Sequence, residues 1–99
     1  MATLLDKLMI ANNLFAVGAG AYHGFCRSRG IEIDPNSFTA STLYGPTLLM
    51  AGLGALKAQK GEYDRPISPG ITGFVGIVHG AFVTGIGFGL GYLVGMTTT

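Results

Sequence analysis

The sequence predicts an all-α integral membrane protein with three transmembrane helices, arranged as antiparallel hairpins and packed through glycine. Three observations lead to this prediction. Only 11% of the 99 residues are charged, while 48% are hydrophobic. The few charges cluster, so that three long stretches carry none, and most of the 17 glycines lie inside those stretches. A soluble chain of this length buries only about 60% of its surface, and 11 charged residues are too few to cover the remainder. We therefore expect the apolar surface to face lipid or other protein.

The charge-free stretches set the expected spans. About 20 apolar residues cross the ~30 Å hydrocarbon layer as a helix. The third stretch is longer than one crossing requires, so we expect it to tilt or to extend beyond the lipid. Both connecting loops are short, which predicts antiparallel neighbours. Within a single membrane domain, residues 1–99, the expected spans are 8–26, 38–56 and 70–96, and the loops are 27–37 and 57–69.

Short sequence signals mark the helix ends. Thr3 and Asp6 have the spacing of a capping box, so the first helix should begin before the membrane. Residues 34–37 read Asp-Pro-Asn-Ser, which combines a helix stop with an N-cap. Ser68 followed by Pro69 fits the start of the third helix.

Charge asymmetry between the loops favours a cytoplasmic N-terminus. The N-terminus and the second loop lie on one side and hold four basic residues, and the first loop holds two. An Ala-x-Ala sequence at 19–21 resembles a signal-peptidase site. Asn12 and Asn13 interrupt the apolar core that such a peptide needs, so we expect no cleavage there.

Small residues follow a helical spacing and form the candidate packing faces. Small residues allow close approach of helix backbones, which drives association in lipid. In the third span the face is Gly73, Gly76, Gly80, Thr84, Gly87, Gly91 and Gly95, and in the first span it is Ala16, Gly20 and Gly24. Gly85 and Gly89 open a second groove nearly opposite the first. These faces either pack the chain's own three helices or also build a larger assembly. We favour assembly, because three helices alone leave little interior for a function.

Two histidines inside the spans are candidate cofactor ligands. His23 and His79 each occur in a Gly-x-x-His-Gly sequence, and intramembrane ionisable residues are often functional. Such a pair could be the axial ligands of a haem or pigment. At 1.5 Å per residue, however, their depths differ by about 10 Å. We therefore expect both to be hydrogen-bonding packing residues, with a cofactor as the alternative.

Other polar and special residues have a structural and a functional interpretation. Asn13 shares the small face of the first span, so it should form a hydrogen bond across a helix contact. The alternative is that Asn12 and Asn13 line a pore. Pro46 should kink the second span, for bundle shape rather than gating. His23 and Cys26 alone do not make a zinc site, so no metal is expected.

No catalytic motif is visible, so we expect a non-enzymatic protein. The sequence has no phosphate loop, no paired catalytic carboxylates and no Ser-His-Asp arrangement, and a net charge of +1 gives no nucleic-acid footprint. The leading hypothesis is a structural subunit of a membrane complex or of a helical homo-oligomer. The alternatives are a small oligomeric, holin-like pore and a cofactor-carrying subunit that uses His23 or His79. Its short, glycine-packed helices resemble those of pilus subunits, translocase subunits, holins and accessory respiratory subunits, but no motif is shared.

Overall fold

The computed structural model describes residues 3–33 and 37–98, and for Ser37 and Phe38 it describes the backbone alone. These residues form three α-helices and no β-strand: α1 (Leu4–Ser28), α2 (Ser37–Gln59) and α3 (Pro69–Thr97). The prediction of an all-α chain with three helices is confirmed. Each helix extends beyond the corresponding expected span by between one and four residues at either end.

Two of the predicted helix starts are also confirmed. Thr3 caps α1: its hydroxyl accepts a hydrogen bond from the Asp6 amide at 3.2 Å, and the Asp6 carboxylate accepts one from the Thr3 amide at 3.2 Å. Ser68 caps α3 and Pro69 occupies the first turn, where a missing N–H costs nothing. The predicted stop and N-cap between α1 and α2 fall on residues 34–36, which lie outside the described residues, and on the side chain of Ser37.

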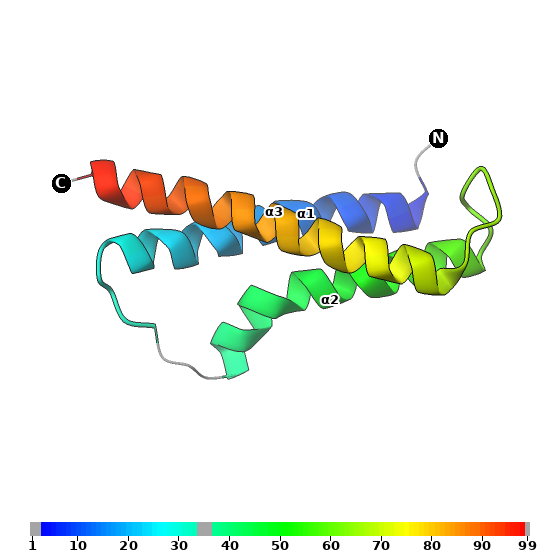
Figure 1. Cartoon of the computed structure of the whole chain (residues 1–99), viewed down its shortest axis with the longest axis horizontal. Coiled ribbons are helices and arrows are strands. Elements are labelled where there is room, and N and C mark those ends of the chain that lie inside the picture. The colour runs from blue at the N-terminus through cyan, green and yellow to red at the C-terminus, as the bar shows by residue number, and fades with distance from the viewer. Residues whose placement is uncertain (1–2, 34–36, 99) are drawn as a thin grey trace.

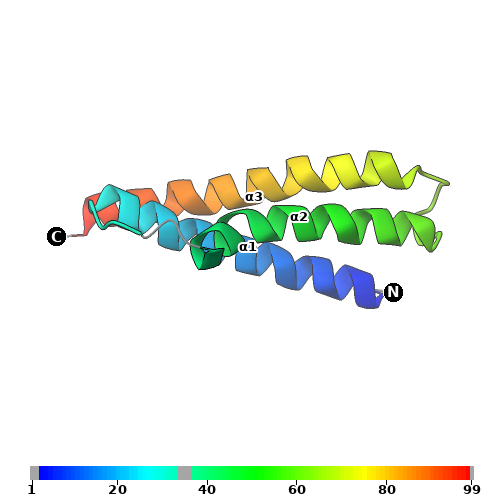
Figure 2. The same ribbon diagram turned by 90° about the horizontal axis from the view of Figure 1, so that it is seen from below.

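Successive helices run antiparallel (Figure 1). The bundle is elongated, 50 × 27 × 19 Å. α3 packs against both other helices, whereas α1 and α2 touch each other much less. Figures 1 and 2 show why: α3 lies beside α2 near the second loop and beside α1 near the C-terminus. α3 is therefore the element that holds the bundle together.

The start of α2 bends away from the other two helices (Figure 1). Pro46 lies inside this helix, and proline both removes a helical hydrogen bond and crowds the preceding turn. The bend separates the first turns of α2 from the end of α1. This separation creates the cavity described below.

Length and composition mark one described helix, α3, as able to cross a membrane. At 29 residues and 1.5 Å per residue it is about 43 Å long, more than the ~30 Å of hydrocarbon. α1 and α2 do not reach the same apolar character. In α1 two asparagines and a histidine lower it, and in α2 a run of hydroxyl residues does so.

Candidate functional site: helix contacts and cavities

Glycines of α3 and α1 form the closest helix contact. A Cβ added at Gly91 would stand 2.6 Å from the Cα of Ala21. One added at Gly87 would stand 2.9 Å from the Cα of Val17. From the other side, a Cβ at Gly20 or Gly24 would meet the backbone of Thr84 or Phe88. Two helix backbones this close leave room only for hydrogen at these positions.

The same face of α3 packs against α2 nearer the second loop. A Cβ at Gly76 would stand 2.8 Å from the Cα of Ala51, and one at Gly80 would stand 2.7 Å from that of Thr47. Gly73 has more room, with the nearest atom 3.6 Å away. The two neighbours of α3 thus share one face at different heights, because α3 crosses from one to the other.

The remaining small residues of the predicted faces lie next to these contacts. Ala16 is buried in α1, and Gly95 lies against Ser28 and Phe25 at the last turn of α1. The structure places Ala16, Gly20, Gly24, Gly76, Gly80, Gly87, Gly91 and Gly95 at contacts within the chain. The second groove differs: nothing lies within 4 Å of a Cβ built at Gly85 or Gly89.

Of the two adjacent asparagines, Asn12 forms the hydrogen bond between helices. Its side-chain amide donates to the Pro46 carbonyl at 2.8 Å, in a buried position. Asn12 lies four residues before Ala16, on the buried side of α1. Asn13, for which we predicted this role, is not among the buried residues of α1, and its Oδ1 is buried without a partner among the described residues.

The two histidines occupy different places. His23 is buried, and its Nε2 lies 3.0 Å from the Thr42 hydroxyl of α2. His79 is exposed and lines a small cavity, about 230 Å³, together with Asn13 and Tyr63. Because His23 and His79 line separate cavities, the structure does not bring them together as two ligands of one macrocycle.

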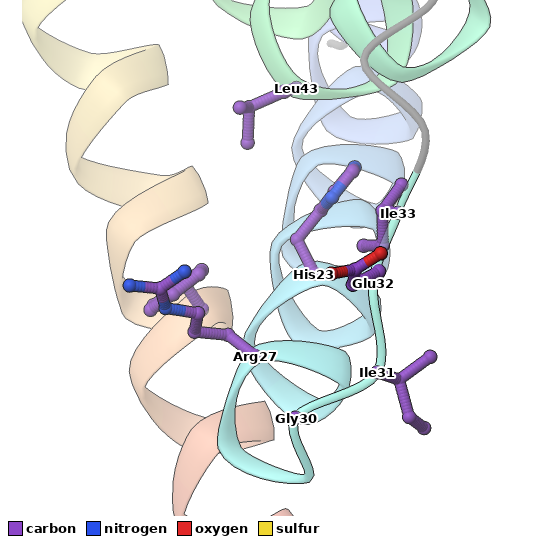
Figure 3. A pocket seen from close by; sticks show the side chains of 8 residues that line it. His23, Arg27, Gly30, Ile31, Glu32, Ile33 and Leu43 are labelled. Carbon is purple, nitrogen blue, oxygen red and sulfur yellow. The ribbon is translucent and has the colours of Figure 1, made fainter.

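A further cavity lies at the end of α1, where α2 bends away. Its volume is about 620 Å³. Figure 3 shows His23 and Arg27 projecting from α1, Glu32 on the loop that follows, and Leu43 on α2. Phe88 of α3 completes the wall. Sequence reasoning identified His23 but missed this cavity. The signal was present in Pro46, whose kink opens the space.

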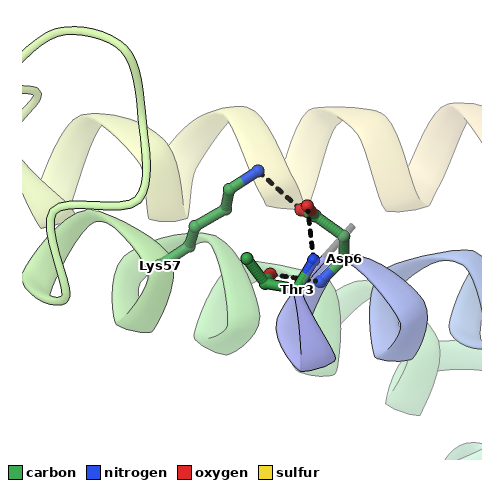
Figure 4. Close-up of polar contacts among 3 residues, drawn as sticks. All are labelled: Thr3, Asp6 and Lys57. Atoms are coloured by element: carbon green, nitrogen blue, oxygen red, sulfur yellow. Dashed lines mark hydrogen bonds and ion pairs between the residues drawn. The ribbon is translucent and has the colours of Figure 1, made fainter. Parts of the chain in front are cut away.

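At the opposite end of the bundle an ion pair connects α1 and α2 (Figure 4). The Lys57 ammonium lies 2.6 Å from the Asp6 carboxylate, and the side chains are 17% and 29% exposed. The hydrogen bond from Lys57, with that from the Thr3 amide, lowers the pKa of Asp6 below its ordinary 3.8. The same hydrogen bond raises the pKa of Lys57 above 10.5. The pair therefore links the first turn of α1 to the last turn of α2.

Comparison with known proteins returned no matching family model, no similar curated protein and no similar solved structure. Function is therefore inferred from the chain's own residues.

Proposed function

We propose that the chain is an integral membrane protein with three spans that serves as a non-enzymatic structural subunit. The observation that carries this proposal is the distribution of side-chain size. The buried residues of α3 are all glycine or threonine. Large apolar side chains point outward instead; Phe74 and Phe82 are each 67% exposed and Leu14 is 71% exposed. No large side chain among the described residues is fully buried.

A protein in water has the opposite distribution. Soluble monomers bury large apolar residues and rarely expose apolar patches beyond a few hundred Å². In lipid the outside can be as apolar as leucine, and helices associate through small residues and hydrogen bonds. The inward glycines and the hydrogen bond from Asn12 to Pro46 match that pattern. The length and composition of α3 add support.

The outer face of α3 is the surface through which we propose the subunit assembles. Gly85 and Gly89 are exposed there, and no other helix among the described residues lies within 4 Å of a Cβ built at either position. Phe88, Leu90 and Tyr92 rise around Gly89 and form an apolar depression on this face. Another helix can approach closely at such a position. Assembly through α3 leaves the internal glycine face undisturbed.

The test is the native mass of the chain purified in mild detergent. Gly89→Ile adds bulk on the open face of α3, so we expect a lower native mass or the loss of a co-purifying partner. Gly52→Ile is the matched control, because Gly52 is also exposed, with nothing near an added Cβ. A wild-type chain that is monomeric and alone in detergent would contradict the assembly proposal.

A small oligomeric pore is the second candidate function. One observation favours it: the unpartnered Asn13 Oδ1 and the His79 ring line the same cavity. Polar groups of this kind can face water inside an oligomer. Liposome leakage that Asn13→Leu abolishes would select this function, whereas intact liposomes would leave the structural subunit.

A further inference from the structure

The cavity at the end of α1 combines two charges of opposite sign with apolar walls. Arg27 and Glu32 are both exposed at its rim. Ile33, Leu43 and Phe88 contribute apolar surface. The cavity volume, about 620 Å³, is in the range that holds small ligands. The shape thus offers both a polar rim and an apolar wall to one molecule.

The two rim charges do not neutralise each other. Among the described residues the structure contains one ion pair, between Lys57 and Asp6 at the other end of the bundle. In Figure 3 the Arg27 guanidinium and the Glu32 carboxylate lie on opposite sides of His23. His23 itself is engaged with Thr42. Arg27 and Glu32 therefore remain available to an anionic and a cationic group of a ligand.

We propose that this cavity binds a zwitterionic phospholipid with a primary ammonium headgroup. Arg27 pairs with the phosphate, because guanidinium matches phosphate geometry. Glu32 pairs with the ammonium, and the acyl chains lie along Leu43 and Phe88. This inference depends on the proposed membrane location, in which Arg27 marks the end of the first span and hence the level of the headgroups.

The charge pattern favours a zwitterionic lipid over an anionic lipid and over a bare phosphate. An anionic lipid without an ammonium group would place Glu32 beside negative charge, which is unfavourable. A bare phosphate would leave the apolar wall uncovered. A headgroup with both charges satisfies both rim residues, and acyl chains cover the wall.

The test is native mass spectrometry of the full chain from mild detergent containing equal amounts of phosphatidylethanolamine and phosphatidylglycerol. We expect wild type to retain phosphatidylethanolamine preferentially. Arg27→Gln should weaken retention of that lipid about tenfold, as expected for the loss of one charge-assisted hydrogen bond. Glu32→Gln should remove the preference between the two lipids. Lys60→Gln, an exposed charge at the opposite loop, is the control and should retain lipid like wild type.

Three outcomes would overturn the inference: equal retention of both lipids by wild type, Arg27→Gln that retains lipid normally, or competition by glycerophosphoethanolamine, which lacks acyl chains. Circular dichroism of each variant checks the fold. Failure of the proposed function looks different. A chain that stays in aqueous solution without detergent contradicts the membrane location, whereas a membrane-bound chain with no lipid preference contradicts this inference alone.

Discussion

At the scale of single residues, polar side chains in this bundle serve to hold helices together. Asn12 ties α1 to α2 through the Pro46 carbonyl, and His23 ties the same helices through Thr42. These two bonds bridge the pair of helices with the least direct contact. Hydrogen bonds thus hold α1 and α2 together where their backbones do not pack closely.

The asparagine pair allows a matched test of this idea. Asn12→Ala removes a buried hydrogen bond, so we expect the free energy of unfolding to fall by about 0.5–2 kcal/mol. Asn13→Ala removes a carbonyl oxygen that is buried with no hydrogen-bond partner in the part of the chain that the structure describes, so its effect should be smaller. Thermal or denaturant unfolding of both variants in detergent measures the difference. Equal destabilisation by the two substitutions would refute the assignment.

The ion pair of Asp6 and Lys57 predicts a pH dependence of stability. The pKa of Asp6 is lowered by the Lys57 hydrogen bond, so its contribution is complete above pH 3.8 and disappears as the pH falls through the lower folded value. The pKa of Lys57 is raised, so its contribution is complete below pH 10.5 and disappears as the pH rises beyond it. Stability should therefore be level between these limits and fall outside them.

Asp6→Asn isolates the acidic part of this dependence. The variant loses the ion pair, so its melting temperature should change less than that of wild type below pH 3.8. Measuring both proteins by circular dichroism in the same detergent checks this. Parallel acid curves for the two proteins would show that the pair does not contribute.

At the scale of elements, α3 determines how the bundle is built. The side facing its neighbours is made of glycine and threonine, and the outward side is made of large apolar residues. Gly91 and Gly89 are two residues apart but lie on these two different sides. Substitutions at Gly91 therefore affect packing within the chain, whereas substitutions at Gly89 affect only the proposed assembly surface.

Replacing each of these glycines with alanine tests the internal packing. Alanine improves intrinsic helix stability by up to ~1 kcal/mol, and Gly89→Ala has open space for its methyl group. We expect that variant to be neutral or slightly more stable. The methyl group of Gly91→Ala would collide with the backbone of Ala21, so α1 and α3 must separate, at a cost of about 1–3 kcal/mol. Equal melting temperatures would contradict the observed contact.

The sequence predicted the helices better than their contacts. The helices could be located from the charge-free stretches and from the N-cap residues Thr3 and Ser68. Both signals are local, because each depends only on residues in or next to the helix. The small face of α3 was also predicted from its spacing. That this one face contacts α2 at one end and α1 at the other was not predicted, because the angle at which α3 crosses its neighbours depends on the whole bundle. The bend at Pro46 was predictable, but the cavity needs the relative positions of three helices.

At the scale of the whole molecule, the side chains are distributed in the reverse of a soluble bundle: small residues lie inside and large apolar residues lie outside. The buried hydrophobic residues in the described part of the chain are few: Leu5, Ala16, Cys26, Met50 and Leu53. A core this small would stabilise a 99-residue chain in water only weakly. In the proposed membrane location lipid covers the outward side chains, so the proposed function depends on membrane insertion with three crossings.

The most direct test of the three-span proposal is the sidedness of the two loops. Ile31 and Lys60 are exposed residues of the first and the second loop, and each can carry a single cysteine once the buried Cys26 is replaced by alanine. Three crossings require that a membrane-impermeant maleimide label Ile31→Cys and Lys60→Cys from opposite sides of sealed membranes. Labelling of both from the same side, or recovery of the protein in the soluble fraction, would contradict the proposal.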